Sequence, residues 1–196
     1  MSKTATSPIK TSLTHPLSLP AVATPGGGGI GMAMCPGKQQ PEAITGPWDR
    51  DLKVDLAAIT RFGARSLITL METAELTAAR VPTDVLQSAA QTAELAWYHW
   101  PIVDFAAPDA DFERLWQSEA AIICRQLLAG GKIVVHCRGG RGRSGLVAAR
   151  LLIELGINPD DAIANVRAVQ PMAMETTAQE AHVRAYRPRL TGLKYP

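Results

Sequence analysis

The sequence predicts an α/β protein with a central, mostly parallel sheet flanked by helices. Short apolar runs rich in β-branched residues alternate along the chain with longer segments whose apolar residues recur at helical spacing. The chain has 196 residues, enough for one domain with a substantial core. Hydrophobic residues make up 46% and charged residues 19%, which is ordinary for a globular protein.

Composition divides the chain into three parts. Residues 1–29 are rich in Ser, Thr, Pro and Gly and hold few bulky apolar residues, so we expect a flexible tail there. Residues 30–190 carry the periodic segments and form the expected folded domain. Residues 191–196 are expected to be a short C-terminal tail.

In the first half of the domain, Ile30–Met34 is an apolar stretch stopped by Pro36-Gly37, and we expect an opening strand there. Leu52, Leu56, Ile59 and Phe62 recur at helical spacing. The remaining expected elements are a helix over 51–62, a buried strand over 66–70, a helix capped by Thr83 and running to about Leu95, and a strand over 97–103.

The second half continues the alternation. One face of the segment 111–128 is apolar, and Gly130-Gly131 follows it, so a long helix is expected. Ile133, Val134 and Val135 form the centre of a short core strand over 132–136. Three further helices are expected over about 142–155, 160–169 and 176–187.

Composition also excludes several classes of protein. The formal net charge of +2 gives no nucleic-acid signature. Three cysteines without a CxxC pair argue against a disulfide framework or a zinc site, and no metal or organic cofactor is implied, because the four histidines have no ligand-like spacing. We find no apolar run of ~18 residues and no signal-peptide pattern, so we expect no membrane insertion and a cytoplasmic location.

The most informative segment is His136-Cys137-Arg138-Gly139-Gly140-Arg141-Gly142-Arg143-Ser144, between the strand over 132–136 and the next helix. The first amides of a helix lack intrahelical partners, and the helix dipole adds positive potential. A glycine-rich loop at that point can turn its N–H groups inward and enclose a phosphate or sulfate anion. We expect Gly139, Gly140 and Gly142 to allow a backbone path that side chains would block.

Cys137 lies at the base of this loop. Amide dipoles, a helix start and Arg143 favour its thiolate, and such surroundings lower a cysteine pKa to ~3.5–7.5. Arg143 has the planar fork that matches two phosphate oxygens. We expect Ser144 to hydrogen-bond the sulfur and His136 to orient the loop. The alternative is a buried structural cysteine beside a basic turn, but the complete string favours a nucleophile that attacks phosphate monoesters.

This string resembles the HCxxxxxR[ST] signature of the cysteine-dependent protein tyrosine phosphatase superfamily. The chain is most similar to the small dual-specificity-like members and the kinase-associated phosphatase branch. Shared landmarks over about residues 30–187 are Cys35-Pro36-Gly37, Arg50-Asp51-Leu52, Glu75-Leu76 and Pro101-Ile102-Val103-Asp104. The resemblance implies a phosphotyrosine-phosphatase-like fold, a phosphocysteine intermediate, and a phosphorylated protein or peptide as substrate.

Attack by a thiolate needs a proton for the leaving oxygen, and a general acid contributes ~100- to 10,000-fold. Asp104 is our candidate, because it follows a strand and opens a segment similar to the mobile acid loop of the family. Asp109 and Asp111 compete for this role, but they stand at an expected helix start, where capping explains them.

The segment 173–179 is similar to a family pattern of two glutamines four residues apart that position the attacking water. Here Glu175 stands at the first glutamine position and Gln179 at the second. Gln179 is therefore a supporting candidate. The alternative places Glu175 at a helix start and Gln179 on the surface.

Other readings stay open. Arg138 and Arg141 resemble the basic loop positions of lipid phosphatases, so a phosphoinositide or another polyanionic phosphate ester is an alternative substrate. A non-catalytic phosphate-binding module and a different thiol enzyme, such as a rhodanese, are further alternatives. Cys35 or Cys124 is a candidate to pair with Cys137 in a protective disulfide on oxidation.

Overall fold

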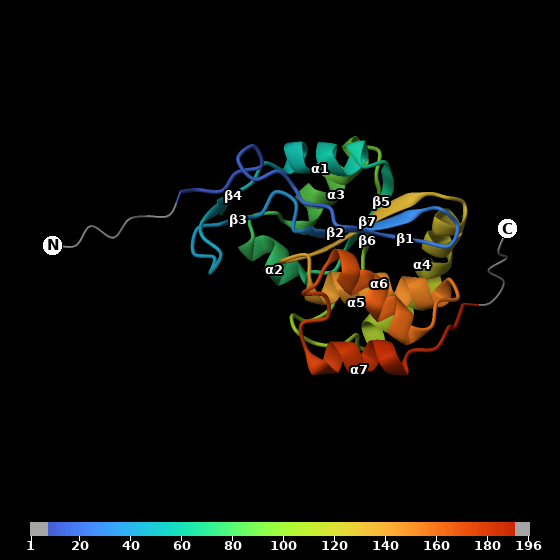
Figure 1. Cartoon of the computed structure of the whole chain (residues 1–196). Helices are drawn as coiled ribbons and strands as arrows, with labels where there is room; N and C mark the ends of the chain where they lie inside the picture. Colours follow the sequence, from blue (N-terminus) through green and yellow to red (C-terminus); the bar gives the residue numbers. More distant parts are fainter. Residues whose placement is uncertain (1–7, 191–196) are drawn as a thin grey trace.

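Five strands form the central sheet of the computed structural model, which describes residues 8–190 (Figure 1). Their order across the sheet is β1-β2-β7-β5-β6, and only the pairing of β1 with β2 is antiparallel. The predicted α/β class with a mostly parallel sheet is confirmed. The strands are β1 (Ala21–Ala23), β2 (Gly29–Met34), β5 (Ala64–Thr69), β6 (Ala96–His99) and β7 (Lys132–Cys137).

Strand β7 lies in the middle of the sheet, between β2 and β5. Its residues Ile133, Val134 and Val135 are fully buried, as expected of a strand covered on both faces. In register, Cys137 lies beside Met34 of β2, and His136 lies beside Thr69 of β5. The last residues of β7 are therefore held by hydrogen-bonded neighbours on both sides.

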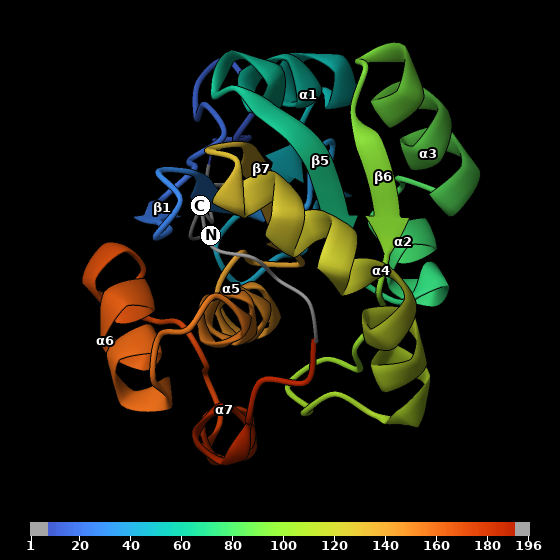
Figure 2. The same cartoon turned by 90° about the vertical axis from the view of Figure 1, so that its right-hand side faces the viewer.

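Helices cover both faces of this sheet (Figures 1 and 2). Helices α1 and α3 lie on one face, and the layer of α4, α5, α6 and α7 lies on the other. Each face has its own buried apolar cluster. The helices are α1 (Leu52–Arg61), α2 (Thr73–Ala78), α3 (Thr83–Thr92), α4 (Ala110–Leu128), α5 (Gly142–Glu154), α6 (Pro159–Val169) and α7 (Thr177–Ala185).

The elements predicted from periodicity are confirmed, with two differences at their ends. Helix α3 begins at Thr83, but Pro82 is its N-cap residue and the Thr83 hydroxyl is buried without a hydrogen-bond partner among the described residues, so Thr83 is not the cap. The strand predicted over 97–103 ends at His99. Pro101 has no N–H to continue the ladder, although Trp100 and Ile102 still donate to the carbonyls of Thr69 and Leu70.

Besides β1, three short elements were not predicted. Helix α2 has six residues and too few apolar positions to show a period. Strands β3 (Gln39–Gln40) and β4 (Trp48–Asp49) form a separate antiparallel pair of two residues each. Such lengths lie below what a pattern of hydrophobic residues can indicate.

The prediction of a flexible tail is wrong for residues 8–29. Strand β1 pairs with β2, Lys10 bridges to Trp48, and the side chains of Leu17 and Val22 are buried in the core. A few apolar residues are enough to hold this segment because the edge of β2 supplies backbone partners. The rest of the predicted tail, residues 1–7, and the predicted tail 191–196 lie outside the described residues.

A buried cation joins α4, α5 and the end of α7. Arg150 is fully buried, and its guanidinium forms two hydrogen bonds of 2.6 and 3.1 Å with Glu113. The same group stacks on the rings of Tyr186 and Trp116, 4.0 and 4.2 Å from their centroids. The helical layer is therefore fixed by a charged cluster as well as by apolar packing.

Between residues 8 and 190 no helix combines the length and the apolar composition that crossing a membrane would require.

Candidate active site

The loop between β7 and α5 lies at the carboxyl end of the central strand. Strand β7 ends at Cys137 and helix α5 begins at Gly142, as the sequence predicted. Helix α5 is buried along its whole length, so it packs under the sheet and fixes the direction of its first turn. Ligand sites in α/β folds commonly lie at this edge of the sheet.

The three loop glycines differ in what they require. Gly140 has a φ of +72°, and a Cβ there would come within 2.5 Å of the backbone of Ala33. A Cβ on Gly142 would lie 2.6 Å from a carboxylate oxygen of Glu175. The expectation that Gly139 also needs to be glycine on steric grounds is wrong, because a Cβ at Gly139 would meet no atom within 4 Å.

Polar groups of the loop surround the sulfur of Cys137. The Gly140 amide donates to Sγ at 3.2 Å, and the Ser144 hydroxyl lies 3.6 Å from it. The Gly140 carbonyl accepts from the Gln170 side chain at 3.0 Å, which fixes the turn from outside. The predicted contact between Ser144 and the sulfur is therefore present.

His136 is fully buried behind the loop, with its Nε2 2.8 Å from the Thr69 hydroxyl. That hydroxyl also accepts from the Trp97 indole at 2.8 Å. Burial lowers the pKa of His136 to about 3, so its ring is neutral at physiological pH. This placement agrees with the predicted orienting role.

Arg143 is 1% exposed and held by acceptors on several elements. Its Nη1 donates to the carbonyl of Ile102 at 2.9 Å, and its Nη2 lies 2.8 Å from the carboxylate of Asp104. Its Nε is buried and has no partner among residues 8–190. The two terminal nitrogens thus fix the orientation of the guanidinium, and its Nε–H group remains without an acceptor among the described residues.

Glu75 of α2 is the main holder of Arg143, and its role was not recognised from the sequence. Its carboxylate accepts from Nη1 and Nη2 of Arg143 at 2.6 and 3.0 Å, and it also pairs with Arg138 at 3.2 Å. Burial opposes its ionisation, but the hydrogen bond from Arg143 and the adjacent charges keep the pKa of Glu75 below its usual value. The landmark Glu75-Leu76 was the available signal.

The same pair determines the charge of the arginine. Burial alone would lower the pKa of Arg143, but the hydrogen bond with Glu75 and the charges of Cys137, Glu75 and Asp104 raise it above its usual value. The guanidinium is therefore a permanent cation beside the sulfur.

Asp104 lies at the same pocket, although it follows an extended segment and not the end of a long strand. Its side chain is 33% exposed and pairs with Arg143. The next residue, Phe105, has a left-handed φ of +61° and a largely exposed ring. Such a conformation is costly for a bulky residue and is characteristic of functional loops.

The two competing aspartates have other tasks. Asp109 is the N-cap of α4, where its carboxylate accepts from the Phe112 amide at 2.9 Å. Asp111 forms an exposed ion pair with Arg114 one turn along the same helix. Neither lines the pocket that contains Cys137.

The start of α7 fastens the loop that carries Asp104. The Thr176 hydroxyl donates to the Phe105 carbonyl at 3.1 Å, and the Gln179 amide group donates to the Ala106 carbonyl at 3.2 Å. Gln179 is 1% exposed and lies against Gly142, so the expectation of a surface residue is wrong. Its position between the two loops makes it a positioning residue.

Glu175 reaches into the phosphate loop itself. One of its carboxylate oxygens accepts from the Gly142 amide at 3.0 Å. It follows Met174, whose φ is +58°, and Arg167 donates to the carbonyls of Ala173 and Met174. One amide of the anion-binding loop is therefore occupied by a carboxylate of the chain.

The loop between β7 and α5 and the segment that carries Asp104 line a pocket of about 550 Å³, here called the active-site pocket. Cys137, Arg143 and Asp104 lie on its wall with the loop residues Arg138, Gly139 and Arg141. Arginine, loop amides and a helix start provide positive potential around the sulfur, while Asp104 supplies a carboxyl group. The arrangement can bind an anion and present a nucleophile and an acid to it.

All three cysteines are free thiols, and Cys35 and Cys124 are fully buried. Burial raises the pKa of each of these two to about 12. Cys124 is a residue of α4, and its side chain packs in the core. The described part of the chain contains no cluster of three His, Cys, Asp or Glu side chains placed to hold a metal ion.

Comparison with known proteins agrees with this geometry. A family model described as "Swiss Army Knife protein, DSP-PTPase phosphatase domain" matches residues 41–192. Cyclin-dependent kinase inhibitor 3 of Rattus norvegicus is 32% identical over 147 residues, which cover 73% of this chain and 66% of that protein. The chain thus spans about two thirds of the length of the curated relatives it matches.

Solved structures show the same fold. Kinase associated phosphatase, in a crystal structure with its catalytic-site cysteine changed to serine, has a TM-score of 0.72 and 25% identity, covering 86% of this chain and 92% of that one. Tk-PTP in its active form has a TM-score of 0.58 and 25% identity, covering 79% and 88%. With a matched family model, the loop signature and this fold, the chain belongs to the dual-specificity (DSP-PTPase) family of phosphatase domains in the protein tyrosine phosphatase superfamily.

Proposed function

We propose that this chain is a protein phosphatase that hydrolyses phosphate monoesters, phosphotyrosine first and phosphoserine or phosphothreonine in addition, through a phosphocysteine intermediate. The observation that carries the proposal is the placement of three groups in one pocket. The Cys137 sulfur accepts from a loop amide, Arg143 keeps a free buried donor, and Asp104 lies on the facing wall. Membership of the dual-specificity family supports the same chemistry.

In the first step the thiolate of Cys137 attacks phosphorus. The S–P bond forms while the ester P–O bond breaks, and Asp104 gives its proton to the leaving oxygen. The free Nε of Arg143 and the loop amides bind the non-bridging oxygens as they gain charge. Binding of the phosphate dianion to Arg143 takes the place of the contact between Asp104 and that arginine, which leaves the Asp104 carboxyl group free to face the leaving oxygen.

In the second step water attacks phosphorus, and the carboxylate of Asp104 takes the proton of that water. The S–P bond breaks, phosphate leaves, and the Ser144 hydroxyl donates to the departing thiolate from its position 3.6 Å away. Gln179 contributes by holding the backbone of the acid loop next to the phosphate loop. Each proton that Asp104 releases in the first step is thereby recovered in the second.

Phosphate release from para-nitrophenyl phosphate and from phosphotyrosine, phosphoserine and phosphothreonine peptides tests the proposal. We expect activity that Cys137→Ser abolishes, with the variant still able to bind a phosphopeptide. An active Cys137→Ser variant would refute the phosphocysteine intermediate. Binding without any turnover by the unaltered chain would indicate a phosphate-binding module.

A further inference from the structure

Lys38 is a buried cation on the wall of the active-site pocket. Lys38 is 6% exposed, and it lines the pocket together with Cys137 and Arg138. Within residues 8–190 its ammonium group forms no ion pair, and no side-chain hydrogen bond holds it. The ammonium nitrogen is not itself sealed from solvent, so the charge of Lys38 faces the active-site pocket, where an anion that enters can reach it.

The backbone of Lys38 is held firmly by a charged clamp beneath it. Asp55 binds Arg50 through two hydrogen bonds of 2.8 and 2.7 Å, and it also accepts from the Gly37 amide at 2.9 Å. The Arg50 amide donates to the Lys38 carbonyl at 3.1 Å. Gly37 has a φ of +71°, and a Cβ there would lie 2.7 Å from the Leu52 side chain. The site is therefore built and not a chance position of a mobile lysine.

The pocket carries more positive charge than a single phosphate monoester needs. Arg143 and the loop amides suffice to bind one phosphate. Two carboxylates, Asp104 and Glu175, share the lining with five cations, and Glu75 behind the lining pairs with two of these cations, so three carboxylates face five cations. The cations are Lys10, Lys38, Arg138, Arg141 and Arg143.

The lowered pKa of Lys38 also favours an anion at this place. Burial lowers the pKa of Lys38, and although Cys35 opposes this, the positive charge of Arg138 lowers it further. An anion placed between Lys38 and Arg138 would relieve both effects and favour the charged lysine. An anion bound there would therefore raise the pKa of Lys38, as the nearby Cys35, Cys137 and Asp104 already do in part.

We propose that Lys38 and Arg138 form a second anion subsite beside the phosphate loop, which binds a carboxylate or a second phosphate on a residue next to the phosphorylated residue of a peptide substrate. This inference rests on the proposed phosphatase function and specifies its substrate class. Lys38 lines the same pocket as Cys137, so the two anions would occupy one pocket and must be close neighbours on the substrate.

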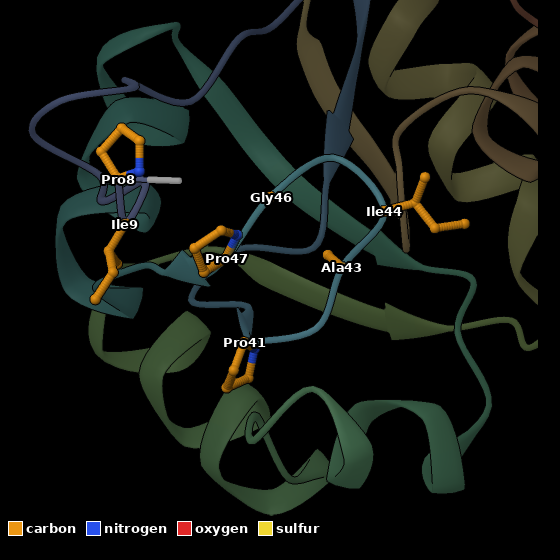
Figure 3. Close-up of a pocket in the computed structure, with 7 residues that line it drawn as sticks. All are labelled: Pro8, Ile9, Pro41, Ala43, Ile44, Gly46 and Pro47. Carbon is orange, nitrogen blue, oxygen red and sulfur yellow. The ribbon is translucent and has the colours of Figure 1, made fainter. Parts of the chain in front are cut away.

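The surface next to the pocket favours a peptide as the carrier. The loop 41–47 separates the active-site pocket from a second cavity of about 720 Å³ (Figure 3). Among residues 8–190, those that line this cavity are uncharged, and most of them are prolines and aliphatic residues. Ile44, at the tip of the loop, is fully exposed, points away from Pro8 and Ile9, and borders both cavities. The uncharged residues next to the phosphorylated part of a peptide could lie in this second cavity while the charged residues occupy the active-site pocket.

The experiment compares matched phosphotyrosine peptides with Glu or Gln on both sides of the phosphotyrosine, and a third with phosphoserine beside it. For the unaltered chain we expect kcat/KM to favour the acidic and the doubly phosphorylated peptides by about tenfold, the size of one charge-assisted hydrogen bond. Lys38→Met should reduce this preference to less than about twofold, because it keeps the apolar stem and removes the charge. Effects on the chemical step cancel in the ratio, since the rate measured for every peptide is loss of the phosphotyrosine phosphate, which mass spectrometry separates from loss of the phosphoserine phosphate.

Lys38→Arg should keep most of the kcat/KM preference for acidic and doubly phosphorylated peptides, because it retains the positive charge. Lys53→Met is the control: it removes an exposed charge from α1 outside the pocket and should leave the whole preference in place. Lys38→Gln replaces Lys38→Met if thermal unfolding shows that the latter does not fold. An unchanged preference in the folded variant overturns the subsite, as does an unaltered chain that hydrolyses all peptides equally. Absence of phosphate release from every substrate refutes the proposed function, and the subsite with it.

A further arm uses vesicles that contain a bisphosphorylated phosphoinositide. If Lys38→Met lowers phosphate release from these vesicles and leaves the peptide preference unchanged, the second anion belongs to a lipid headgroup and the peptide proposal is wrong. Loss of the preference among the peptides, with no loss of phosphate release from the vesicles, supports the peptide proposal.

Discussion

Glu75 binds both terminal nitrogens of Arg143, at 2.6 and 3.0 Å, across 68 positions of the sequence. The pair joins the short helix α2 to the phosphate loop and leaves the Arg143 Nε free to meet a substrate. The orientation of the arginine, and so of the bound phosphate, depends on a residue that does not itself touch the sulfur.

Glu75→Gln should lower kcat/KM on para-nitrophenyl phosphate by about 100-fold, the effect of a misplaced reacting group. The amide can accept only one of the two hydrogen bonds and carries no charge. Glu94→Gln, on the exposed end of α3, is the matched control and should leave the rate within twofold. A Glu75→Gln variant with normal kcat/KM would show that Arg143 is oriented by Ile102 and Asp104 alone.

Asp104→Asn should lower kcat by about 100-fold or more on phosphotyrosine peptide, because an amide cannot donate the proton that the leaving oxygen needs. Binding of phosphate should stay within a few-fold. Asp109→Asn makes the same chemical change five residues later, where asparagine still caps α4, and should leave kcat unchanged. Full turnover by Asp104→Asn would assign the acid to another group.

Glu175→Gln should tighten inhibition by inorganic phosphate by about tenfold at neutral pH, since it removes a negative charge that competes for the Gly142 amide. The measurement is the inhibition constant for phosphate in the para-nitrophenyl phosphate assay. Glu94→Gln again serves as control. An inhibition constant equal to that of the unaltered chain would mean that the Glu175 side chain swings away without cost.

Gly140→Ala should destabilise the fold by about 3 kcal/mol, because the new Cβ overlaps the Ala33 backbone and the left-handed φ is unfavourable for alanine. Gly139→Ala, one residue earlier, meets open space and should change the free energy of unfolding by less than about 0.5 kcal/mol. Denaturant unfolding of the two variants provides the comparison. Equal destabilisation would contradict the described loop conformation.

His136 should make stability depend on pH in a specific window. Its folded pKa of about 3 lies below the usual 6.5, so below 6.5 the unfolded chain binds a proton that the folded chain does not. Stability is therefore fully present above about 6.5 and is lost as the pH falls toward 3, by up to about 1.4 kcal/mol per pH unit. In His136→Asn the slope of unfolding free energy between pH 6 and 4 should be smaller by that amount. Parallel slopes would show that the histidine is protonated in the folded state.

Local patterns explain why much of the fold and of the site could be predicted. Ile133 to Val135 form a strand that is apolar throughout, and the loop signature follows it directly, so Cys137, Arg143 and the start of α5 come from one continuous segment. Asp104 could be placed because an acid is required and few aspartates follow a strand.

Contacts between distant segments explain what was missed. Glu75 lies on a six-residue helix with little periodicity, and its partner Arg143 is remote in sequence. Lys38 shows no pattern at all, because its burial depends on the Arg50–Asp55 clamp. The segment 8–29 reads as a tail because the support for β1 comes from the edge of β2.

Strand β7 has neighbours on both sides up to His136, and Cys137 still pairs with β2, while Asp104 is carried by a segment fastened through Thr176 and Gln179. The proposed nucleophile, Cys137, is thus part of the rigid frame of the protein, whereas the segment of the proposed proton donor, Asp104, is held by two hydrogen bonds from the start of a peripheral helix. Substrate entry and product exit then require displacement of the donor side alone. Evolutionary change in the outer helices can adjust the rate of turnover while the position of the sulfur stays the same.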